Sequence, residues 1–239
     1  MLAFTKFAFT KFVLRRVSAA RFCGIAMIVF VAAGFVREAI AQQAGSERWK
    51  SAIEAFEKAD ATMPPAKNAN LFVGSSSIRM WKLDDSFPDL SVINRGFGGS
   101  QIEDSVHYIE QLVLKHEPRV VVLYAGDNDI GSGKSPERVL ADYQAFVDAV
   151  HKSLPKTRIA FIAIKPSLKR WSLIDKIRDA NQRIEAVTKT DDRLEFIDVD
   201  APMLDSDGKP RGELFQKDGL HLSDEGYRLW ASLVRPHLK

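Results

Sequence analysis

Apolar positions along the chain follow two spacings that alternate. Short runs rich in apolar and β-branched residues predict strands at 71–74, 91–94, 119–125, 158–164 and 194–198. Longer segments repeat apolar residues every three to four positions, which predicts helices at 45–60, 101–115, 136–152, 172–188 and 223–235. After residue 70 we find no internal repeat and no linker. Residues 42–239 are therefore expected to form a single domain.

The middle strands have the pattern of buried parallel strands. The run "RVVVLYA" at 119–125 is apolar without alternation, as expected where helices cover both faces of a sheet. Five strands alternating with helices predict an α/β fold, a doubly wound and mainly parallel sheet. Such sheets bind ligands beyond the carboxyl ends of their strands, so functional residues are expected there.

The first 41 residues have the order of a secretory signal peptide. A basic section without acids precedes an apolar stretch at 22–36, and Ala39-Ile40-Ala41 provides a small-x-small cleavage site. The apolar stretch is shorter than the about 20 residues of a spanning helix. We expect cleavage after Ala41 and a periplasmic or secreted protein. The alternative is an uncleaved N-terminal anchor, which would attach the protein to the membrane.

Removal of this leader changes the charge balance. The leader holds six of the 34 basic residues and one of the 31 acidic residues, which leaves 28 basic and 30 acidic in 42–239. The basic character therefore belongs to the leader and gives no support for nucleic-acid binding. Cys23, the only cysteine, also lies in the leader. Without cysteine, the remaining chain cannot form disulfides, use thiol catalysis or bind a metal through thiolates.

Four polar or glycine-rich segments follow predicted strands. They are "GSSS" at 74–77, "NRGFGGS" at 94–100, "AGDNDIGSG" at 125–133 and "KDGLH" at 217–221. Together they suggest acyl transfer, in which a serine nucleophile needs a base, and the base needs a group that fixes its tautomer. Asp218 and His221 are close enough for one turn to present both. Backbone N–H groups of Ser76 and of the turn at 98–99, with the Asn128 amide, are candidate oxyanion donors.

At these blocks the chain resembles the SGNH (GDSL-type) esterases and acylhydrolases. The blocks "FVGSSSI", "NRGFGGS", "AGDND" and "DGLH" stand in the order of that family and span 72–221. The resemblance implies a flavodoxin-like sheet, an ester substrate and no cofactor. It also implies a Ser-His-Asp triad of Ser76, His221 and Asp218, with the oxyanion hole formed by Ser76, Gly99 and Asn128.

The serine block departs from the family at one position. The aspartate that usually precedes the nucleophile is Ser75 here, which leaves three adjacent serines as candidates. We favour Ser76, because it keeps the spacing from the glycine and lies where a helix is expected to begin. Its neighbours Ser75 and Ser77 are then expected to shape the turn.

Further residues flank the expected site. Trp81 and Phe97 can line an acyl or sugar pocket, although aromatic residues at such positions are also typical of a core. Arg79 can recognise an anionic group or pair with a local acid, and Asp127 is a further candidate for substrate binding. The segment "DSDG" at 205–208 lacks the rest of a calcium motif and is interpreted as a turn, so no metal is predicted. Without an evident apolar lid in 70–239, short acyl groups on a carbohydrate or lipid are expected.

Two other functions are compatible with parts of the sequence. The segment "NDIGSGKS" at 128–135 nearly matches a phosphate-binding loop, but it lacks the first glycine, and Pro136 follows where the helix should continue. A non-catalytic carbohydrate- or lipid-binding protein on the same scaffold is the stronger alternative, because a fold does not determine function. The sequence makes no prediction of oligomeric state.

Overall fold

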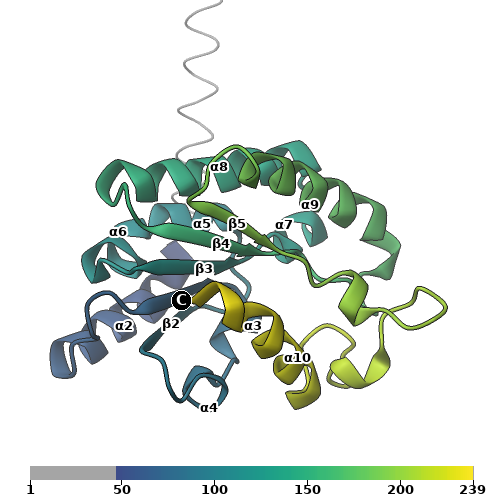
Figure 1. The fold of residues 1–239 in the computed structure, drawn as a ribbon, viewed down its shortest axis with the longest axis horizontal. Coiled ribbons are helices and arrows are strands. Elements are labelled where there is room, and N and C mark those ends of the chain that lie inside the picture. The colour runs from purple at the N-terminus through teal and green to yellow at the C-terminus, as the bar shows by residue number, and fades with distance from the viewer. Residues whose placement is uncertain (1–46, 239) are drawn as a thin grey trace, which may run out of the picture. The chain divides into compact units, whose positions relative to one another are not determined.

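A computed structural model describes residues 47–238, which form one five-stranded parallel sheet between two layers of helices (Figure 1). The strand order is β2-β1-β3-β4-β5, and every neighbouring pair is parallel. This order is that of flavodoxin-like sheets, in which the strand order reverses between β1 and β3 while all strands stay parallel. The strands are β1 Asn70–Gly74, β2 Val92–Gly96, β3 Val120–Tyr124, β4 Arg158–Ile162 and β5 Leu194–Ile197. The predicted doubly wound α/β fold is confirmed.

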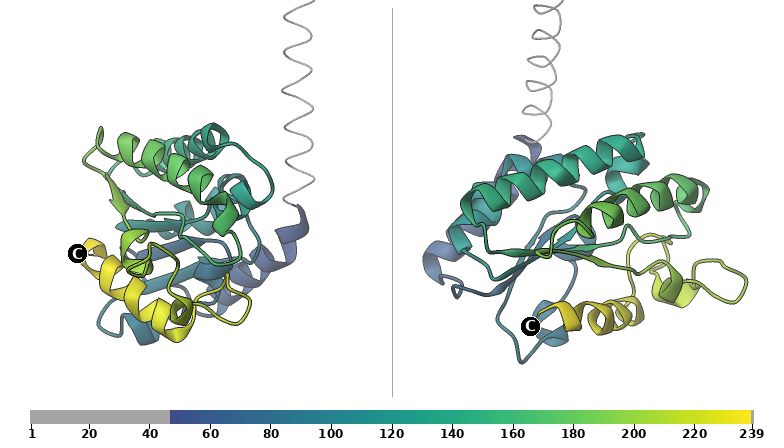
Figure 2. Two further views of the ribbon diagram at one scale, coloured as in Figure 1. Left: turned by 90° about the vertical axis from the view of Figure 1, so that its right-hand side faces the viewer. Right: turned by 45° about the horizontal axis from the view of Figure 1, so that its top comes forward.

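Both faces of the sheet are buried. Within β1, Leu71 and Val73 pack into one core and Phe72 into the other, as the two-residue period of a strand requires. Figure 2 shows α8 and α9 on one side of the sheet and α10 on the other. The first core is covered by α2 Lys50–Thr62, α5 Ile102–His107, α6 Ile109–Leu112, α8 Pro136–Ser153 and α9 Ile174–Thr188. The second is covered by α3 Ser76–Arg79, α4 Leu83–Ser86 and α10 Asp224–Val234.

One predicted helix is divided in the structure. The expected helix at 101–115 consists of α5, α6 and a 3₁₀ turn at Leu114–His116. Tyr108 separates the first two with φ −101° and ψ 24°, and its backbone N–H still donates to the carbonyl of Asp104. The predicted stripe of Ile102, Val106, Ile109 and Val113 still faces the first core, with Ile102 and Val113 buried and the other two partly buried against it. Similar 3₁₀ turns, Glu47–Trp49 and Trp171–Leu173, precede α2 and α9.

The loops after the strands are fixed by close backbone packing. Gly74 ends β1 with φ +139°, and a Cβ there would lie 1.9 Å from the carbonyl oxygen of Tyr124. Only glycine permits this approach together with a positive φ. From here the chain enters α3, while α7 Asp127–Gly131 follows β3. The segments predicted to meet at one edge of the sheet are thereby brought together.

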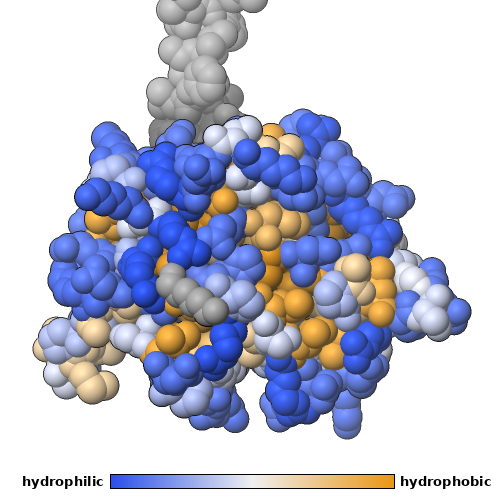
Figure 3. All heavy atoms as spheres, in the orientation of Figure 1, coloured by the Kyte–Doolittle hydropathy of each residue, from blue (hydrophilic) through white to orange (hydrophobic). Residues whose placement is uncertain are grey.

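The surface of the described part is largely hydrophilic on the face shown in Figure 3, with a hydrophobic area between α9 and α10. In residues 47–238, no helix combines the length and the hydropathy of a membrane span.

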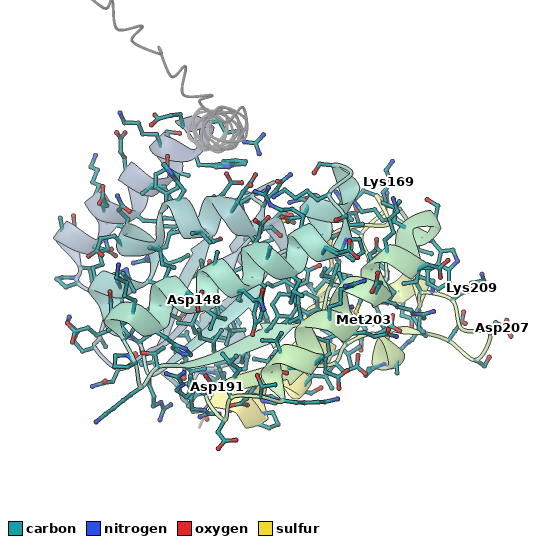
Figure 4. The ribbon with its side chains drawn as sticks, turned by 90° about the horizontal axis from the view of Figure 1, so that it is seen from above. Asp148, Lys169, Asp191, Met203, Asp207 and Lys209 are labelled. Atoms are coloured by element: carbon teal, nitrogen blue, oxygen red, sulfur yellow. The ribbon has the colours of Figure 1, made fainter. Side chains whose placement is uncertain are left out.

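The segment 205–208 is a turn, in which Asp205 accepts hydrogen bonds from the N–H groups of Asp207 and Lys209. Asp207 lies at the tip of this projecting loop (Figure 4). The predicted leader, 1–41, lies outside the described residues.

Candidate active site

Of the three adjacent serines, Ser76 is the one whose hydroxyl is hydrogen bonded to a histidine. Ser75 is extended and caps α3, and its N–H donates to the carbonyl of Tyr124. Ser75 and Ser77 are each 2% exposed, whereas Ser76 is half-buried as the first residue of α3. The Oγ of Ser76 lies 3.1 Å from Nε2 of His221.

The loop between Phe215 and Leu222 presents His221 to this serine. Its Nδ1 lies 2.5 Å from Oδ2 of Asp218, whose other oxygen accepts the N–H groups of Leu220 and His221. These backbone hydrogen bonds and the His221 ring lower the pKa of Asp218 to about 2. The carboxylate therefore holds the proton on Nδ1, which leaves Nε2 as the acceptor for the serine hydroxyl.

The glycine segment after β2 lies against the serine turn. The N–H of Phe97 donates to the carbonyl of Gly74 at 2.9 Å, which ties the two loops together. A Cβ on Gly96 would lie 2.1 Å from the backbone N of Arg79, so glycine is required for this contact. Gly99 is exposed and has φ +80°. Its backbone N–H donates to none of the described residues, and the residue lies at the surface.

The amide of Asn128, in α7, has a fixed orientation. Its Nδ2 donates to the carbonyl of Ser100 at 2.9 Å, and its Oδ1 accepts from Arg170 at 3.1 Å. A guanidinium group can only donate, so the atom that faces Arg170 must be the oxygen. The NH₂ group is therefore directed towards the glycine segment and has a second hydrogen left to donate.

A buried charge cluster lies under Asn128. Lys165, 1% exposed, donates to Oδ2 of Asp127 at 2.8 Å and to the hydroxyl of Tyr124 at 2.9 Å. Arg170 donates to the other oxygen of Asp127. Burial raises the pKa of Asp127, but the charges of Lys165 and Arg170 outweigh it, so the pKa is lowered overall. Burial likewise raises the pKa of Tyr124 to about 12.

Sequence reasoning missed Lys165 and Arg170. They stand in "KPSLKRW", which directly follows the apolar run of β4. That position after a parallel strand was the available signal, because it places them at the same edge as the other blocks. Lys165 and Arg170 stand five positions apart in a polar stretch, which nevertheless resembles an ordinary solvated loop.

Two candidates for substrate binding are corrected. Asp127 is 4% exposed, and both of its oxygens are occupied by Lys165 and Arg170, so it supports Asn128 from below. Phe97 is 1% exposed and packs edge-on against Trp49, with ring centroids 5.7 Å apart. Both are interior residues, because their side chains satisfy buried partners.

Trp81 is also a core residue, at 3% exposure. Its ring packs among aromatic side chains of the second core, and its Nε1 donates to Ser86 at 2.9 Å. It borders a cavity of about 560 Å³ between α4, α10 and the segment that follows α3. The lining includes Gln216 and Leu222 of the His221 loop but none of Ser76, Gly99, Asn128 or His221. Arg79, by contrast, is exposed beside the glycine segment.

No cluster of three or more His, Cys, Asp or Glu side chains suited to a metal ion occurs within residues 47–238. Two hydrogen-bonded series of polar groups bear on the chemistry of the candidate site. One is the series Asp218–His221–Ser76, and the other is Arg170–Asn128–Ser100. The first can move a proton from a hydroxyl, and the second can present an N–H donor to a developing negative charge.

Comparison with known proteins gives the chain a family. Residues 74–229 match the GDSL-like lipase/acylhydrolase family, which is more than half of the chain. A search of curated proteins found no match.

Solved structures of similar fold share 17–22% of their residues with this chain. A protein from Streptococcus pneumonia, described as a platelet activating factor, is 22% identical to this chain. Its TM-score is 0.73, over 90% of this chain and 99% of that one. A GDSL-like lipase from Bacteroides thetaiotaomicron is 20% identical, with a TM-score of 0.68 over 78% and 96%. A carbohydrate esterase family 3 protein from Talaromyces cellulolyticus is 17% identical, with a TM-score of 0.59 over 71% and 96%.

These similarities agree with the order of the four blocks and with the sheet topology. The family match spans the segment from Gly74 to Leu229, which includes the serine turn, the glycine segment, α7 and the His221 loop. The chain belongs to the GDSL-like lipase/acylhydrolase family and is a carboxylic ester hydrolase of that type.

Proposed function

We propose that the protein is an exported serine esterase in which Ser76, His221 and Asp218 form the catalytic triad. The observation that carries this proposal is the hydrogen-bonded series Asp218–His221–Ser76, which ends at the first residue of α3. A serine, its base and the group that orients the base are thus within contact distance.

In the first half of the reaction, the Ser76 oxygen attacks the carbonyl carbon of the ester while its proton passes to Nε2 of His221. Asp218 stays ionised and stabilises the charged imidazole, because its pKa of about 2 lies far below neutral pH. The carbonyl oxygen becomes an oxyanion. It accepts hydrogen bonds from the backbone N–H groups of Ser76 and Gly99 and from Nδ2 of Asn128.

The tetrahedral intermediate then expels the alcohol. His221 returns its proton to the leaving oxygen, which leaves an acyl group on Ser76. Water repeats the sequence: His221 takes a proton from it, the hydroxide oxygen attacks the acyl carbonyl, and the acid leaves as Ser76 recovers its proton. Every proton in this cycle passes through Nε2.

Short-acyl esters of a carbohydrate or a lipid are the proposed substrates. Residues 70–239 contain no long apolar segment suited to a lid. Within the described residues, the large exposed apolar side chains are Met63 and Leu168. Leu168, 47% exposed, lies against Gly219 in the turn between Asp218 and His221. One exposed leucine beside the base offers apolar contact to a short acyl group and little to a long chain.

The test is hydrolysis of nitrophenyl esters from acetate to decanoate by the purified protein and by its Ser76→Ala and Ser75→Ala variants. We expect the first variant to lose nearly all activity, the second to keep it, and the rate to be greatest with short acyl groups. Labelling by a fluorophosphonate probe identifies the reactive serine directly. A protein that binds esters or sugars without hydrolysis and without labelling is the non-catalytic alternative.

Export is a separate part of the proposal and depends on the leader. A charged section, an apolar stretch and the Ala39-Ile40-Ala41 site support it. Cell fractionation and N-terminal sequencing of the mature protein test it. A chain that begins at Gln42 in the periplasm or medium is expected, whereas an intact chain in the membrane fraction supports the anchor.

A further inference from the structure

Arg79 lies beside the glycine segment of the proposed site. It is the last residue of α3, one helical turn after Ser76. Its Nε lies 2.9 Å, and its Cζ and one terminal nitrogen 3.4 Å, from the point where a Cβ on Gly98 would stand. The guanidinium therefore lies over Gly98, next to the residue proposed to donate to the oxyanion, and this contact depends on a position without a side chain.

The guanidinium of Arg79 has no ion-pair or hydrogen-bond partner among residues 47–238. Within residues 47–238, every other arginine side chain forms an ion pair or donates to a carbonyl oxygen, whereas that of Arg79 does neither with any described residue. Exposed arginines on this protein thus usually find an acid. The exception stands at the edge of the proposed active site.

The acids of the proposed site already have partners. Asp218 holds His221 and two backbone N–H groups of its own loop. Asp127 is buried, with one oxygen on Lys165 and the other on Arg170. Neither carboxylate is available to neutralise Arg79. Its positive charge is therefore exposed to solvent and accessible to a substrate.

We propose that Arg79 binds an anionic group of the substrate, so that the preferred esters carry a carboxylate, sulfate or phosphate close to the scissile bond. This inference rests on the proposed function and names the class of ester. Arginine suits the role, because its planar fork donates two parallel hydrogen bonds to such groups and stays charged at every relevant pH. The anion belongs either to the acyl part or to the alcohol part.

Paired esters separate these two sources. Mono-4-nitrophenyl succinate against 4-nitrophenyl butyrate places the charge on the acyl part, and 4-carboxyphenyl acetate against phenyl acetate places it on the alcohol part. The ratio of kcat/KM within each pair is measured for the wild type, Arg79→Gln and Arg79→Lys. Arg183→Gln, a change in an arginine of α9 that pairs with Asp179 and Glu137, is the control.

We expect Arg79→Gln to lower kcat/KM by roughly tenfold for the anionic ester of one pair, mainly through KM, and to leave its neutral partner within about twofold. Arg79→Lys should keep part of the preference, Arg183→Gln all of it, and added salt should weaken it. Equal losses on both esters of each pair would place Arg79 on the oxyanion or in the fold, and no loss would leave it without a role. Either result overturns the proposal.

A binding measurement keeps this proposal apart from the proposed function. In the Ser76→Ala background, titration calorimetry with the same esters should show tighter binding of the anionic ester, and the added Arg79→Gln change should abolish the difference. Equal binding of the anionic ester with and without Arg79, or no binding, contradicts the proposal. A wild type that hydrolyses no ester refutes the serine esterase and leaves this calorimetric result to decide the anion site.

Discussion

A single side-chain amide shows how finely the site is oriented. The two ends of an asparagine amide have nearly the same shape, so only hydrogen bonds decide which one faces the substrate. In Asn128 the decision is made by Arg170, which cannot accept a hydrogen bond and so holds Oδ1. Arg170 is in turn held by Asp127, which Lys165 keeps ionised in the interior. The buried charges are therefore arranged to aim a neutral donor.

Removal of this donor should lower the turnover rate strongly and the stability of the fold only slightly. We expect Asn128→Ala to lower kcat by a factor on the order of 10²–10³, since an oxyanion donor acts mainly in the transition state. The melting temperature, measured by circular dichroism, should change little because the residue is half-buried. Near-normal turnover would contradict the assigned role.

Arg170→Gln should act through Asn128. The amide then loses one of its two orienting hydrogen bonds and keeps the one to the Ser100 carbonyl, and kcat is expected to fall by roughly tenfold at constant KM. Asp127 keeps its contact with Lys165, so the variant should still fold. In the Asn128→Ala background the same change should have almost no further effect on kcat. Independent, multiplying losses in the double variant would show that Arg170 does not work through this amide.

The acid limb of the pH profile should report one group. Asp218, with a pKa of about 2, stays ionised across the range in which an esterase is assayed. Protonation of His221 alone then removes the base, so log kcat/KM should fall with a slope of one towards low pH. A slope of two would argue against this assignment, because it would require Asp218 to take up a second proton.

Among the elements, the turn from β1 into α3 sets the position of the nucleophile. Gly74 takes φ +139° and touches the backbone of β3, Ser75 stays extended, and the helix begins at Ser76. The reacting hydroxyl is thus fixed by backbone contacts rather than by its own packing. The turn is consequently intolerant of any side chain at its first position.

Gly74→Ala should destabilise the protein by about 3 kcal/mol or more, because the new Cβ would meet a backbone oxygen at 1.9 Å as well as an unfavourable φ. Gly133→Ala is the matched control: its φ is +99°, but no atom lies within 4 Å of the added Cβ. That change should cost only about 1 kcal/mol. Urea unfolding of both variants measures the difference, and equal costs would remove the contact as the cause.

The elements also show where sequence reasoning succeeded and where it stopped. The apolar runs located all five strands, and the blocks after them contained Ser76 and His221, which lie in contact. Their partners Lys165 and Arg170 were not recognised, because a charge that is buried by tertiary contacts looks like a solvated one in sequence. Trp81 and Phe97 were ambiguous for the opposite reason: an aromatic residue has the same pattern in a core as in a pocket.

At the scale of the whole molecule, a second charge cluster joins α2 to β2 through residues 35 positions apart in the chain. Arg95 donates to Asp60 and, at 3.3 Å, to Nε2 of His116. His116 is 5% exposed, and burial, with the charge of Arg95, lowers its pKa to about 4. The ring is thus neutral in the folded protein under conditions that would protonate it in the unfolded chain.

This cluster predicts a loss of stability in mild acid. The folded pKa of His116 lies below its ordinary value of 6.5, so between about pH 6.5 and 4 the unfolded chain binds a proton that the folded state does not. The free energy of unfolding should fall by roughly 2–3 kcal/mol over that range. Denaturant unfolding at several pH values measures it, and His116→Gln should remove this part of the slope. An unchanged slope in that variant would assign the loss to other groups.

The hydrogen bond between Ser76 and His221 joins residues that are 145 positions apart in the chain. Contacts of such separation close large loops and are expected to form late in folding. Neither α3 nor the His221 loop can be active before the strands between them have assembled. The return of ester hydrolysis after dilution from denaturant should therefore lag behind the return of secondary structure. The rate at which activity returns then measures the rate of the last step of folding.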